Sequence, residues 1–87
     1  MGEKRIKKCI LVQYSGSPDS TLDIQIERTA KQCKLEYDGS GFDLVKHVRD
    51  HFVYGTSTFR IHQFQEAIKS LSKLSAIKIT TKIEEAE

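Results

Sequence analysis

The stretch that decides the fold is residues 8–33, KCILVQYSGSPDSTLDIQIERTAKQC. Its first part contains the apolar run ILV at 10–12, which is typical of a strand buried on both faces. The residues SGSPD at 15–19 favour turns and interrupt that run. We therefore predict a strand over residues 6–14 that lies inside a sheet rather than at its edge.

The second part of the same stretch has helical spacing, with apolar residues at Leu22, Ile26, Ala30 and Cys33. We predict a helix over residues 18–33, with Ser17 as its cap and Pro18 in its first turn. A strand over residues 21–28 is the alternative, because LDIQI alternates between apolar and polar residues. We favour the helix, since a strand would require a turn at RTAK, which lacks Gly, Pro, Asn and Asp.

Two further strands are expected in the middle of the chain. Leu35 and Tyr37 indicate one strand, and DGSG at 38–41 is the strongest turn signal in the sequence. We predict a long hairpin connection over residues 39–46 and a third strand over 48–54. A helix over residues 43–53 is the competing interpretation, because Leu44, Val48 and Phe52 also have helical spacing.

The last third of the chain predicts a second helix and a fourth strand. The helix is indicated by Phe64, Ile68 and Leu71 on one side, and the strand by the apolar residues of 76–83. The element order βαββαβ predicts one ferredoxin-like domain over residues 1–87, an α+β two-layer sandwich. Its four-stranded antiparallel sheet has two helices on one face, and the first strand lies between the third and the fourth.

This strand order brings the two ends of the chain together. Basic residues open the chain and acidic residues close it: Lys4, Arg5, Lys7 and Lys8, against Glu84, Glu85 and Glu87. Opposite charges across neighbouring strands stabilise their pairing. The charge asymmetry therefore supports this topology and argues against two free interaction tails.

The composition is that of an ordinary globular protein, with 38% apolar and 30% charged residues. A net charge of +2 does not by itself indicate nucleic acid, and the longest apolar run is too short for a membrane span or a secretion signal. We expect a cytoplasmic protein. Cys9 and Cys33 lack the spacing of a zinc site, so we interpret both as buried free thiols.

The sequence has no arrangement of residues that predicts catalysis. Asp43, His47 and His51 are spaced four apart, but a metal needs three or four converging ligands, and we interpret both histidines as surface residues. No local motif places a nucleophile beside a base. The glycines of DGSG lack the spacing of a phosphate-binding loop. We therefore expect no enzyme activity, no metal and no cofactor.

The uncovered face of the sheet is the most informative surface. If Ile10, Val12, Phe52, Tyr54, Ile77 and Ile79 face the helices, alternation places ten residues on the open face. These ten are Lys7, Cys9, Leu11, Gln13, Arg49, His51, Val53, Lys78, Thr80 and Lys82. The expected open face is basic, with a small apolar centre.

The run RDHFVY at 49–54 resembles in part the third strand of RNA-recognition-motif domains. That strand has a basic residue, a glycine and spaced aromatic residues on which bases stack. Here Asp50 stands in place of a small residue, and the first strand, CILVQY at 9–14, lacks the early aromatic residue. The resemblance covers one strand, and we infer neither membership of that family nor tight base stacking from it.

The function expected from these observations is binding rather than catalysis. We expect a protein partner, or a second copy of the chain as in a homodimer, bound through the open sheet face at Leu11 and Val53 or through an edge strand. The alternative is single-stranded RNA or DNA bound by the basic residues Lys7, Arg49, His51, Lys78 and Lys82. A small-ligand regulatory domain is a third interpretation, and a membrane partner is not expected.

Overall fold

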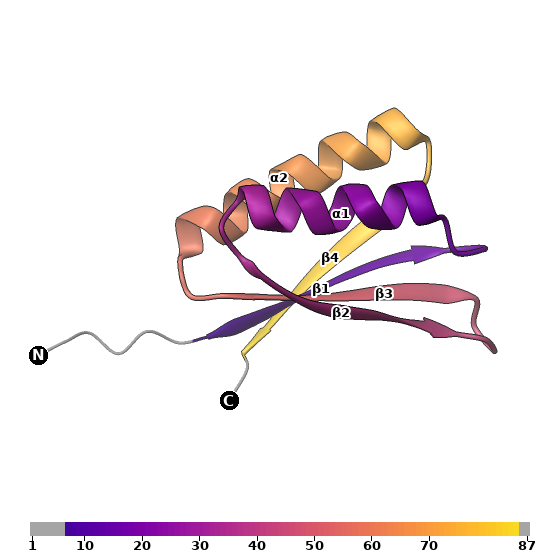
Figure 1. Cartoon of the computed structure of the whole chain (residues 1–87), viewed down its shortest axis with the longest axis horizontal. Helices are drawn as coiled ribbons and strands as arrows, with labels where there is room; N and C mark the ends of the chain where they lie inside the picture. The colour runs from indigo at the N-terminus through magenta and orange to yellow at the C-terminus, as the bar shows by residue number, and fades with distance from the viewer. Residues whose placement is uncertain (1–6, 86–87) are drawn as a thin grey trace, which may run out of the picture.

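The computed structural model describes residues 7–85 and has the predicted ferredoxin-like architecture. The elements are β1 (Lys8–Ser15), α1 (Ser20–Gln32), β2 (Glu36–Asp43), β3 (Val48–Gly55), α2 (Thr58–Ser75) and β4 (Ile79–Glu85). The sheet order is β2-β3-β1-β4, and all three neighbouring pairs are antiparallel. Both helices lie over one face of the sheet (Figure 1).

The two helices form where their apolar stripes meet the sheet. In α1 the buried residues are Leu22, Ile26 and Ala30, so the predicted helix is confirmed and the strand alternative over residues 21–28 is wrong. The N-cap is Asp19 and not the predicted Ser17, because the Asp19 carboxylate accepts a hydrogen bond from the Leu22 N–H at 3.1 Å. Ser57 caps α2, which buries Ile61, Phe64 and Ile68.

The hairpin between β2 and β3 differs from the prediction. The DGSG segment lies inside β2 and not in the turn, which occupies residues 44–47. A β-bulge between Tyr37 and Gly39 accommodates the segment, and Gly39 adopts a φ of +136°. The competing helix over residues 43–53 is wrong, because residues 44–47 form the turn and residues 48–53 belong to β3, which pairs with both β1 and β2.

The core lies between the sheet and the helices. Ile10 and Val12 are fully buried on the inner side of β1, as predicted, and Ile79 of β4 is buried beside them. Both cysteines are free thiols, but only Cys33 is buried, whereas Cys9 is half-buried on the other side of β1. The prediction of two buried thiols is therefore wrong for Cys9.

The ends of the described chain meet as the charge pattern predicts. Lys8 at the start of β1 is directly opposite Glu85 at the end of β4. Lys7 lies beside Glu36 of β2 instead, and Glu84 stands opposite Cys9. Lys4, Arg5 and Glu87 lie outside the described residues. Between residues 7 and 85, neither helix has the length and apolar character that crossing a membrane requires.

Candidate functional site

The alternation of β3 is opposite to the predicted one. Arg49, His51 and Val53 stand opposite Tyr14, Val12 and Ile10 of β1, which are all buried beneath the helices. The placement of Arg49, His51 and Val53 on the open face is therefore wrong, as is the interpretation of His51 as a surface histidine. Phe52 and Tyr54, predicted to face the helices, point to the open face instead.

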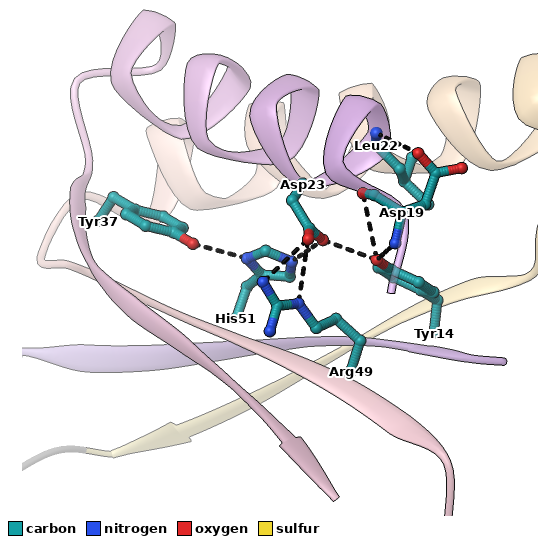
Figure 2. A network of polar contacts seen from close by, with 7 residues as sticks. All are labelled: Tyr14, Asp19, Leu22, Asp23, Tyr37, Arg49 and His51. Carbon is teal, nitrogen blue, oxygen red and sulfur yellow. Dashed lines mark hydrogen bonds and ion pairs between the residues drawn. The ribbon is translucent and has the colours of Figure 1, made fainter. Parts of the chain in front are cut away.

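A polar network explains this alternation (Figure 2). The carboxylate of Asp23 in α1 lies at its centre. Its Oδ1 accepts hydrogen bonds from the Tyr14 hydroxyl at 2.7 Å and from His51 Nε2 at 2.9 Å. Its Oδ2 contacts the Arg49 guanidinium through Nε at 3.1 Å and Nη2 at 2.9 Å. One side chain of α1 is thus bonded to both central strands of the sheet.

The hydrogen bonds fix the tautomer of the neutral His51 ring. A carboxylate only accepts, so Nε2 must carry a proton toward Asp23. Nδ1 of the neutral ring then accepts from the Tyr37 hydroxyl of β2, at 2.7 Å. The imidazole has 0% exposure and no unused polar atom. The network therefore connects three strands and one helix, and the buried ring joins β2 and β3 to Asp23.

The order tyrosine, histidine, aspartate has the form of a proton relay, and burial shifts the pKa values of its tyrosine and histidine. Burial raises the pKa of Tyr37, so its phenol keeps its proton and is not an activated nucleophile. Burial also lowers the pKa of His51, although Asp23 acts in the opposite direction. Because no substrate reaches a ring with 0% exposure, we interpret this network as the structural link between α1 and the sheet.

The electrostatics of the remaining groups agree with a structural role. Burial raises the pKa of Asp23, but the hydrogen bonds from Arg49, Tyr14 and His51 outweigh it and the net shift is downward. Burial is also the main reason why the pKa of Tyr14 is raised to about 12. Asp23 therefore remains a carboxylate and Tyr14 a phenol.

The open face has three cross-strand rows of residues. The register aligns Gly39, Phe52, Leu11 and Lys82 in the middle row. Glu36, Tyr54, Cys9 and Glu84 form the row on one side, and Gly41, Asp50, Gln13 and Thr80 form the row on the other. Gly39 and Gly41 have no side chain, and no atom lies within 4 Å of where a Cβ would be. Phe52 is thus uncovered on its β2 side.

The predicted basic residues do not gather on this face. Lys7 lies 3.5 Å from Glu36 and 5.1 Å from the centre of the Tyr54 ring, and Lys82 lies 3.5 Å from Glu84. Lys78 is exposed but precedes β4, and Arg49 is bonded to Asp23 beneath the helices. Of the predicted protein-binding pair, Leu11 is on the open face and Val53 is in the core.

The histidines also lie apart. His47 is exposed in the turn after β2 and His51 is in the core, so their spacing does not form a ligand pair. Across residues 7–85 no group of three His, Cys, Asp or Glu side chains is placed to hold a metal.

Sequence reasoning missed Tyr14, Asp23 and Tyr37 as partners of His51. One signal was available: Asp23 has the helical spacing of Ile26 and Ala30, and so borders the apolar stripe of α1. Tyr14 likewise continues the inward alternation of Ile10 and Val12. No family model matches the chain, and no curated protein matches it with significant similarity.

Proposed function

We propose that this chain is a non-enzymatic module that binds another protein through the open face of its sheet. The observation that supports this most directly is the middle row of that face, where Leu11 and Phe52 stand side by side with no helix above them. Both side chains are half-buried, so each keeps apolar area that a partner can cover. Tyr54 extends the same surface along β3.

The charges of this face favour a protein over a nucleic acid. Its two lysines, Lys7 and Lys82, each lie against a carboxylate. Asp50 adds a negative charge beside Phe52 and accepts a hydrogen bond from Gln13 at 2.8 Å. The described residues of this face therefore carry no net positive charge, whereas phosphate binding draws on an excess of cations.

One observation favours the nucleic-acid alternative. Phe52 and Tyr54 both face the open side and present rings two residues apart, an arrangement on which unpaired bases stack. Binding of this kind would rest on stacking rather than on a basic surface. It is therefore tested beside protein binding in the same experiment.

A cytoplasmic location is part of this proposal. Cys9 and Cys33 are both unpaired, and Cys9 is half-buried on the proposed binding face. Thiols in this state are typical of proteins in a reducing compartment.

The test compares two phenylalanines of this chain. Phe52→Ser removes the centre of the proposed face, whereas Phe59→Ser removes a ring of α2 that is 75% exposed. We expect immobilised wild type and Phe59→Ser to retain the same protein from lysate, and Phe52→Ser to retain about 10-fold less of it, as a loss of about 1.4 kcal/mol produces. Circular dichroism confirms that both variants are folded.

Two results would contradict the proposal. Equal retention by wild type and Phe52→Ser would show that the open face is not the binding surface. If the retained material is RNA or single-stranded DNA, and binding falls with Phe52→Ser, the module binds nucleic acid instead.

A further inference from the structure

The two edges of the sheet differ in how well they can accept another strand. At the β2 edge, the bulge between Tyr37 and Gly39 breaks the regular pairing. Bulges of this kind protect exposed edges from pairing with other chains. The β4 edge is regular, because its pairing with β1 runs from Ile79 to Glu85 without a shift. β4 therefore presents an unbroken row of backbone groups.

The sequence of β4, ITTKIEE, is self-complementary about Ile83. When two copies of this strand pair antiparallel with Ile83 opposite Ile83, Lys82 of each copy stands opposite Glu84 of the other. The symmetry repeats this contact, which gives two pairs of opposite charge across the new junction. Thr81 stands opposite Glu85 at each end, so five residues of each strand pair.

Other registers are less favourable. If the helices of both copies lie on the same side of the joined sheet, each residue at the junction stands opposite a residue that points to the same face. Centring the pair on Lys82 or on Glu84 places two like charges opposite each other. Centring it on Thr81 places Lys82 opposite Thr80, where its charge has no counterpart. Only the register centred on Ile83 places Lys82 opposite Glu84.

The exposure of Ile83 agrees with this register. Ile83 is on the helix side of β4, opposite Ile10 of β1, and yet 41% of it is exposed. In the paired arrangement the two Ile83 side chains stand next to each other and cover this apolar area. Lys82 and Glu84 are on the open side, more than half exposed, and free to reach a second copy.

We propose that two copies of this chain pair through their β4 edges, with Ile83 at the centre, and form one continuous eight-stranded sheet. The surface involved is the sheet edge and not the open face, so this inference goes beyond the proposed function. Either proposal can fail while the other holds.

Charge reversal tests the register. Lys82→Glu places Glu opposite Glu84 at two points of the junction, and Glu84→Lys places Lys opposite Lys82. We expect wild type to sediment as a concentration-dependent dimer, and each single variant to raise the dimer dissociation constant at least about 10-fold. The double variant Lys82→Glu/Glu84→Lys restores opposite charges and returns the constant to within about 3-fold of wild type.

The control is an exposed pair on α1, the helix that contacts β2 at the other edge of the sheet. Lys31 and Glu27 of α1 lie 2.9 Å apart, and Lys31→Glu reverses one charge of this pair. It changes net charge as Lys82→Glu does, and should leave the dimer unchanged. Even weak association, at about −4 kcal/mol, begins to register at about 500 μM protein. If wild type stays monomeric at this concentration, the inference is overturned. The inference is also overturned if the double variant does not recover the dimer, because the register centred on Ile83 places opposite charges across the junction in that variant.

Discussion

The imidazole of His51 has no contact with solvent, and each of its ring nitrogens has one hydrogen-bond partner. A buried polar group left without a partner costs about 1–3 kcal/mol. Asp23 and Tyr37 remove this cost, and in the neutral ring Nδ1 accepts from the Tyr37 hydroxyl. The groups that face the ring come from every neighbouring element: Asp23 of α1, Tyr14 of β1, Tyr37 of β2 and Arg49 of β3.

The burial of the His51 ring predicts that the free energy of unfolding falls in mild acid. The pKa of His51 lies below its ordinary value of 6.5, so the unfolded chain takes up a proton at a pH where the folded chain does not. The contribution of His51 to stability is therefore constant above about pH 7 and decreases as the pH falls through 6.5 toward the folded pKa. Asp23 adds a second loss below its ordinary value of 3.8, because its folded pKa is also lowered.

Urea unfolding at a series of pH values measures this decrease, and NMR of the ring nitrogens shows whether His51 is still neutral at about pH 6. A midpoint that does not change between about pH 8 and pH 5 would mean that folding does not depend on a neutral His51.

The same residues explain why the inner side of β3 could not be predicted from its own sequence. Phe52 and Tyr54 are more apolar than Arg49 and His51, and local alternation therefore favours the wrong phase. The choice is decided by Asp23, which is 28 residues from His51 in sequence. Because the Asp23 carboxylate bonds Arg49 and His51 at once, both side chains are stable in the core. The periodicity of β3 alone contains no information about this carboxylate.

Among the elements, β2 shows the effect of backbone conformation on a strand. Gly39 has a φ of +136°, where residues with a Cβ are strained, whereas Gly41 has no such φ. At both glycines the space that a Cβ would occupy is open, with no atom within 4 Å. The sequence DGSG correctly indicates unusual backbone at this point, but it does not distinguish a bulge inside a strand from a turn between two strands.

The two glycines give a matched prediction. Gly39→Ala should destabilise the fold by about 1–3 kcal/mol, because it forces a side chain into a strained conformation. Gly41→Ala should change stability by less than about 1 kcal/mol, and in the stabilising direction, because it restricts the unfolded chain. Chemical denaturation of both variants measures the difference. Equal effects would show that β2 has no bulge at Gly39.

At the scale of the whole molecule, the fold was predictable because each element shows its own period. The apolar stripes of α1 and α2 and the apolar run of β1 are local in sequence, and the element order then leaves few topologies. The proposed binding surfaces involve two sides of this sheet. Pairing at β4 with all helices on one side would place two open faces next to each other, so that one dimer offers a partner two copies of Leu11 and Phe52.

The core between the layers gives the last prediction, which concerns three aliphatic residues of α2. Ile68 is 1% exposed, Leu71 is partly buried at the margin of the core, and Leu74 is 86% exposed. The spacing of the sequence alone assigns Ile68 and Leu71 the same importance, but their burial separates them.

Substituting each of these residues by alanine should therefore give three different losses of stability. Ile68→Ala should lower the free energy of unfolding by about 2–5 kcal/mol, since it removes buried methyl groups and leaves a cavity. Leu71→Ala should cost less, because solvent and neighbouring side chains can fill the space, and Leu74→Ala should stay within about 0.5 kcal/mol of wild type. Urea unfolding followed by circular dichroism gives all three values, and a loss for Leu71→Ala equal to that for Ile68→Ala would mean that α2 lies on the sheet with a different face from the one described.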